Sequence, residues 1–86
     1  MYELMIKKFE NALANIQLKV SIGEPYSVAK IEIEKLLAEA NETKSCLLNN
    51  GIRADVMVEL IAIINQISQY REDLIDLIEI QNIKTV

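Results

Sequence analysis

The sequence has 86 residues, enough for one domain, which excludes a function divided between a binding domain and a catalytic domain. Apolar residues make up 51% of the chain and charged residues 26%, a composition typical of a chain that buries a core and unlike that of a disordered one. The net charge of -4 argues against a direct nucleic-acid ligand, because phosphate binding needs clustered Lys and Arg.

The expected location follows from the lack of a membrane span and of a secretory signal in the sequence. The longest stretch without a charged residue, Leu60 to Tyr70, has 11 residues, whereas a membrane span needs roughly 20 apolar ones. Lys7 and Lys8 are not followed by the continuous apolar run of a secretory signal. The single cysteine permits no internal disulfide and suits a reducing compartment. We therefore expect a cytoplasmic protein without a membrane partner.

The first predicted element covers residues 3–21. Two breaks, Gly23-Glu24-Pro25 and Asn49-Asn50-Gly51, divide the chain into three pieces. Apolar residues of the first piece recur at steps of four and three, which predicts one face of a helix. These residues are Met5, Phe9, Ala12, Ile16 and Val20.

The second predicted helix covers residues 26–49. Pro25 suits a first helical turn, and Ser27 is an alternative N-cap. Gly51 is expected to close the helix in the left-handed conformation. Cys46 is predicted to be a small buried hydrophobe. One side is lined by Tyr26, Ala29, Ile33, Leu36, Leu37, Ala40 and Leu47.

The third predicted helix, residues 55–81 with Asp55 as its N-cap, has the widest apolar stripe. Its seam is an unbroken 4-3 series of Val56, Leu60, Ile63, Ile67, Tyr70, Leu74 and Leu77. Beside the seam, Met57, Ile64 and Ile78 repeat at intervals of seven, and Arg71 interrupts them. Four of seven heptad positions are thus mostly apolar, whereas a helix on one side of a small bundle needs about three. We expect self-association, most simply a dimer centred on Ile63 and Ile67.

The expected fold class is all-α. The three pieces predict a small antiparallel three-helix unit, a helical hairpin plus a long third helix, forming a single domain over residues 1–86. A dimeric bundle is its expected extension. The alternative is an α+β fold with a short hairpin around residues 16–33, since residues 16–22 and 30–34 alternate between apolar and polar side chains.

The sequence predicts no catalytic residue, cofactor or metal site. It contains no His, which removes the commonest general base and zinc ligand, and its two glycines form no phosphate-binding loop. Glu39 and Glu42 have a spacing suited to Mg²⁺, and so do Glu72, Asp76 and Glu79. This spacing is similar to that of the acidic helices of all-α nucleotide pyrophosphohydrolases, although their second paired motif is missing or displaced. A carboxylate- and Mg-dependent all-α nucleotide hydrolase is therefore the third functional hypothesis.

The leading functional hypothesis is a small non-catalytic protein-protein interaction module of the adaptor, co-chaperone or inhibitor type. It would bind another protein, including a second copy of itself, through the apolar face of the third helix. The predicted partner-binding residues are Leu60, Ile63, Ile64, Ile67, Tyr70, Leu74, Leu77, Glu72, Asp76 and Glu79.

The acidic residues of the third helix suggest a second hypothesis. Glu72, Asp73, Asp76 and Glu79 lie near the expected C-terminal end of the helix, where negative charge opposes the helix dipole and a basic partner would relieve it. The alternative function is therefore an acidic decoy that occupies a basic nucleic-acid-binding protein through its carboxylates.

Overall fold

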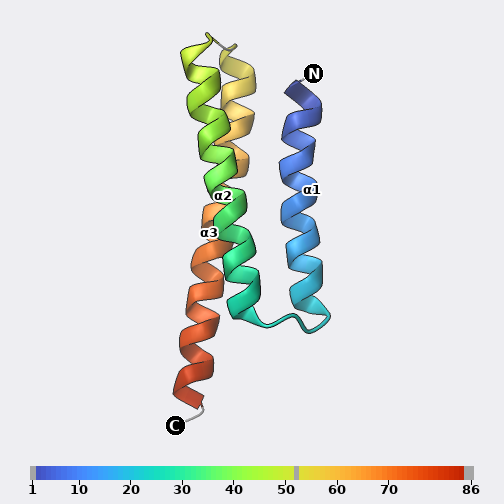
Figure 1. Cartoon of the computed structure of the whole chain (residues 1–86), viewed down its shortest axis with the longest axis vertical. Helices are drawn as coiled ribbons and strands as arrows, with labels where there is room; N and C mark the ends of the chain where they lie inside the picture. The colour runs from blue at the N-terminus through green and yellow to red at the C-terminus, as the bar shows by residue number, and fades with distance from the viewer. Residues whose placement is uncertain (1, 52, 85–86) are drawn as a thin grey trace.

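The computed structural model describes residues 2–51 and 53–84, and over these ranges the chain is three α-helices with no strand. They are α1 (Tyr2–Ser21), α2 (Tyr26–Asn49) and α3 (Ala54–Lys84). Successive helices run antiparallel (Figure 1). The prediction of an all-α, three-helix unit is confirmed.

The alternative hairpin around residues 16–33 is wrong. Ile16 and Val20 lie in the last turns of α1, and residues 30–34 are inside α2. Side-chain exposure follows the helical period: Ile33 is fully buried, whereas Ile31, which a strand would place on the same face, is 57% exposed. The Glu and Lys residues between the apolar ones favour helix over strand, so the alternation of apolar and polar residues did not indicate two paired strands.

The core lies along the axis where the three helices meet, and α2 with α3 forms the most extensive interface. Every buried residue is apolar, and Phe9 is the one aromatic ring among them in the described part of the chain. Packing therefore depends on branched aliphatic side chains, each contributing about 1.5–3 kcal/mol when fully buried. The core cluster is Ile6, Phe9, Leu13, Ile16, Ala29, Ile33, Leu36, Ala40, Leu60, Ile63, Ile64, Ile67 and Leu74.

The helix ends differ in part from the sequence-based expectation. Pro25 stands at the N-cap of α2, with φ -57° and ψ 140°, and Ser27 is already helical, because proline's fixed φ is compatible with the entry to a helix. Asp55 is in the first turn of α3 instead of capping it, and pairs with Arg53 at 3.3 Å. Gly51 has a φ of +71°, which confirms the left-handed conformation predicted for it.

The helices differ in length, and this shapes the molecule. They contain 20, 24 and 31 residues, so α3 is the longest at 1.5 Å of rise per residue. Gln81 shares a small cleft with Glu24 and Pro25 of the α1–α2 turn, and the end of α3 continues past it (Figure 1). The result is a narrow rod of 52 × 20 × 16 Å.

Candidate interaction surface

The predicted apolar seam of α3 is mostly inside the monomer. Ile67, at 0% exposed, and Ile63, at 3%, belong to the core formed with residues of α1 and α2. A dimer of intact protomers therefore has to use other residues. The structure buries five seam residues and one residue beside the seam: Val56, Leu60, Ile63, Ile67 and Leu74, and Ile64.

Tyr70 and Leu77 are the two predicted seam residues that stay partly exposed. Burial raises the pKa of the Tyr70 phenol above its ordinary value of 10.0, and the charge of Asp73, Tyr26 and Glu24 raises it further. The ring thus lies where α3 meets the α1–α2 turn.

The predicted acidic residues Glu72, Asp76 and Glu79 are all exposed. The helix-dipole argument for them is wrong in one respect: α3 continues to Lys84, beyond the expected end at residue 81. Because the dipole acts mainly within the last turn, Glu72 and Asp76 lie too far from the end to oppose it. Their arrangement therefore needs no relief by a partner on that ground.

Pairing divides these acids into two groups. Glu72 accepts a hydrogen bond from Arg71 at 3.3 Å, and Asp73 accepts one from Gln69 at 3.1 Å. Among the described residues, Asp76 and Glu79 form no ion pair. These two carboxylates lie in the last third of α3, and other exposed carboxylates, such as Glu10 and Glu59, also form no ion pair with a described residue.

Exposed isoleucines accompany this charge. Ile83 is 73% exposed and Ile80 48%, and Ile22, at the end of α1, is 78% exposed. We use "distal end" for residues 75–83 of α3. Ile80 and Ile83 were not among the predicted partner-binding residues, because they do not continue the 4-3 spacing of the seam. The sequence indicated them only indirectly, since no Gly or Pro follows residue 81 to end the helix there.

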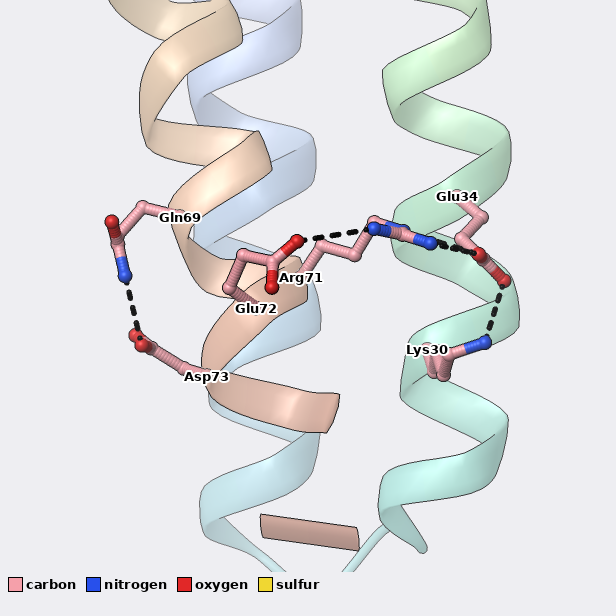
Figure 2. A network of polar contacts seen from close by, with 6 residues as sticks. All are labelled: Lys30, Glu34, Gln69, Arg71, Glu72 and Asp73. Atoms are coloured by element: carbon pink, nitrogen blue, oxygen red, sulfur yellow. Dashed lines mark hydrogen bonds and ion pairs between the residues drawn. The ribbon is translucent and has the colours of Figure 1, made fainter. Parts of the chain in front are cut away.

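A second surface lies on the side of α2 and α3 that faces away from α1. There Arg71 reaches from α3 to α2, with its Nε and Nη2 each 3.1 Å from Oε2 of Glu34, and Lys30 Nζ lies 3.3 Å from Oε1 (Figure 2). The hydrogen bonds from Arg71 and Lys30 hold the pKa of Glu34 below its ordinary value of 4.5. The interruption that Arg71 makes in the seven-residue apolar repeat is thus an interhelical ion pair.

The groove between α1 and α2 holds the other carboxylates considered for metal binding. Glu39 and Glu42 line it together with Glu32, whose Oε1 is 3.7 Å from Lys19 Nζ. Within residues 2–51 and 53–84, no three Asp, Glu or Cys side chains are arranged to hold a metal ion. Cys46 is exposed near the end of α2, so the prediction that it is buried is wrong: its position on the helix turns it outward, whereas Leu47 beside it packs against the core.

Of the described helices, none combines the length and the apolarity needed to cross a bilayer. Comparisons with protein families, curated proteins and solved structures gave no match to this chain.

Proposed function

We propose that this chain is a small, non-catalytic protein-interaction module of the adaptor, co-chaperone or inhibitor type, acting in the cytoplasm. It binds another protein through apolar surface of α3. Because the monomer buries most of the seam, the contact lies at the distal end, with Tyr70 and Leu77 at its inner margin and Glu72, Asp76 and Glu79 around it.

One observation carries the proposal. The end of α3 extends past the α1–α2 turn (Figure 1), and Ile80 and Ile83 near this end are 48% and 73% exposed. Exposed apolar side chains that lie together with a charged border are typical of helix-docking surfaces. A partner that covers both isoleucines gains the hydrophobic stabilisation that the monomer leaves unused.

Affinity capture from the extract of the native host tests the proposal. The test variant replaces Ile80 and Ile83 with Ser. The matched control replaces Leu4 and Leu18 of α1 with Ser, and these two side chains are 75% and 59% exposed. We expect the wild type and the control to capture the same protein at high salt, because an apolar contact resists screening. The Ile80→Ser/Ile83→Ser variant should bind it about tenfold more weakly or worse. Equal capture by both variants would contradict the proposal.

The acidic decoy remains the second candidate because Asp76 and Glu79 are exposed without an ion pair among the described residues. It predicts that a variant with Glu72→Gln, Asp76→Asn and Glu79→Gln loses affinity mainly through a slower association rate, and that the loss shrinks at high salt. The first proposal predicts a small effect of these three changes and a large effect of the isoleucine changes. Surface plasmon resonance with the captured protein separates the two.

A further inference from the structure

A small cleft lies where the distal end of α3 passes the turn between α1 and α2. Val20, Gly23, Glu24, Pro25 and Tyr26 line it from the turn, and Gln81 lines it from α3. Its volume is about 190 Å³, below the roughly 300–1,000 Å³ of pockets that enclose a whole small-molecule ligand. The cleft therefore suits a single side chain of a binding partner.

Glu24 gives the cleft its chemical character. Its Oε2 atom is buried, with less than 1 Å² accessible, and accepts no hydrogen bond from a described residue. The carboxylate also forms no ion pair within the described part of the chain. The lysines on either side of it in the sequence are paired elsewhere, Lys19 with Glu32 and Lys30 with Glu34. A carboxylate that is partly withdrawn from water without a donor or a cation costs free energy, and a cationic partner would offset that cost.

A second carboxylate adds to the negative potential near the cleft. Burial raises the pKa of the Tyr70 phenol, and the charges of Asp73, Tyr26 and Glu24 raise it further. Asp73 and Glu24 therefore act on the same region, where the cleft meets the inner margin of the distal end. No basic side chain is among the described residues that line the cleft. This potential attracts a cation.

The lining residues suit a guanidinium better than a metal ion. Ca²⁺ and Mg²⁺ need several oxygen ligands, whereas Glu24 supplies the single carboxylate among the described residues of the cleft. Gln81 and Tyr26 offer neutral acceptors, and Pro25 and the Tyr26 ring offer flat apolar surface. A guanidinium has several N–H donors, no acceptor and a plane that packs on such surfaces, whereas a lysine ammonium is a compact, strongly hydrated charge.

We propose that this cleft binds an arginine side chain of the protein that contacts the distal end. The inference rests on the proposed function and specifies its partner. Both sides of the cleft continue in the sequence into an exposed isoleucine: Ile22 precedes Gly23 and is 78% exposed, and Ile80 precedes Gln81 and is 48% exposed. The partner segment therefore combines an arginine with apolar side chains that cover the isoleucines.

Glu24 differs in this respect from the acidic residues of α3. Because the fold already withdraws one oxygen of Glu24 from water, a pair formed there loses less hydration on binding and is screened less than an exposed pair. Glu72, Asp76 and Glu79 are exposed, so pairs formed by them contribute little. The arginine contact is thus compatible with a small effect of neutralising those three residues.

Titration with N-acetyl-arginine methylamide, followed by amide NMR of the full chain, tests the cleft directly. The backbone amides of Gly23 and Glu24 and the side-chain amide of Gln81 should shift and saturate, with a dissociation constant on the order of 1 mM. N-acetyl-norleucine methylamide has an aliphatic side chain without charge and should cause no saturating shift. N-acetyl-lysine methylamide should bind more weakly than the arginine amide.

A matched pair of variants assigns the binding to one carboxylate. Glu24→Gln keeps the size of the side chain, removes its charge and should weaken binding of the arginine amide about tenfold or more. Glu59→Gln removes one charge at an exposed position toward the other end of α3 and should leave the binding unchanged. Circular dichroism should show the same helix content in both, because the hydrogen bond from the Glu24 N–H to the Lys19 carbonyl, at 3.0 Å, involves only the main chain.

Surface plasmon resonance with the captured protein tests the same contact in the complex. Glu24→Gln should weaken the binding of that protein about tenfold, whereas Glu59→Gln should not change it. The Glu24→Gln effect should be seen although Ile80 and Ile83 are intact. An arginine that enters the cleft is thereby separated from the apolar contact.

Three results would overturn the inference. The first is an arginine amide that does not saturate the wild type or that binds Glu24→Gln equally well. The second is a norleucine or lysine amide that binds as tightly as the arginine amide. The third is a captured protein that binds Glu24→Gln as tightly as the wild type. In all three cases, capture through Ile80 and Ile83 still decides the proposed function. If no protein is captured, the proposed function and the partner assigned to the cleft are both contradicted, and the arginine titration still decides whether the cleft binds a guanidinium.

Discussion

Arg71 of α3 donates a hydrogen bond from Nε to Oε2 of Glu34 in α2, across 37 residues of sequence, and its Nη2 forms an ion pair with the same oxygen, both at 3.1 Å. The pair fixes the level at which the two helices meet on the side away from α1 (Figure 2). Both side chains are about one-third exposed, so water screens the attraction. The pair therefore contributes more to register than to stability.

The stabilising effect of this pair should depend on pH. Because the folded-state pKa of Glu34 lies below 4.5, the charged carboxylate stabilises the fold above that pH, and the effect is lost as the pH falls through the lowered pKa. Urea unfolding should show Glu34→Gln to be less stable than the wild type at neutral pH, with the difference disappearing in acid. Glu10→Gln, at an exposed carboxylate of α1, is the control. A difference that persists unchanged at low pH would contradict the assignment.

Two neighbouring isoleucines of α2 should respond very differently to truncation. Ile33 is fully buried, and Ile33→Ala should cost roughly 2–5 kcal/mol of unfolding free energy, because it leaves a cavity among the three helices. Ile31 is 57% exposed, and Ile31→Ala should change stability by less than about 0.5 kcal/mol. Denaturant unfolding measures both. Similar losses would support the strand-like alternation, in which both residues share a face.

The helices could be predicted from the sequence because their signals are local. Gly23, Pro25 and Gly51 break the apolar periodicity, and the helix limits at residues 21, 26 and 49 agree with the structure. The last helix is longer than expected because Gln81 is followed by no breaker. Fold class and element order thus needed only spacing and turn residues.

The surface could not be predicted in the same way, because it depends on which residues meet in space. From periodicity, Ile63 and Ile67 were predicted to lie at a dimer interface, but packing with α1 and α2 buries both inside the monomer. The same periodicity did not predict Ile83 as a surface residue, and the additional length of α3 leaves it exposed. Arg71 was an interruption in the pattern until its partner, 37 residues away, was known.

The phenol of Tyr70 should ionise at a higher pH than that of an exposed tyrosine. Its folded-state pKa is above 10.0 because burial disfavours the phenolate, so the unfolded chain ionises first and folding stability falls as the pH rises above that value. Tyr70→Phe removes the ionisable group and should make stability less sensitive to alkaline pH. Phenolate absorbance during a pH titration should show one fewer ionising group in the variant, and the missing group should titrate above pH 10.0. A missing component at or below that pH would contradict the burial of the hydroxyl.

Substitutions of Gly51, in the turn between α2 and α3, should change stability through the backbone conformation of this residue and not through steric clashes. Gly51 has a φ of +71°, and a Cβ added there meets no heavy atom within 4 Å. Gly51→Ala should therefore destabilise the fold by about 1–2 kcal/mol, which is the cost of the left-handed conformation for a residue with a Cβ. Gly51→Asn should cost less, because Asn adopts this conformation more readily than Ala. Thermal and denaturant unfolding of both variants measures the difference. Equal losses for Ala and Asn would instead indicate a steric role, which the empty space around the Cβ position argues against.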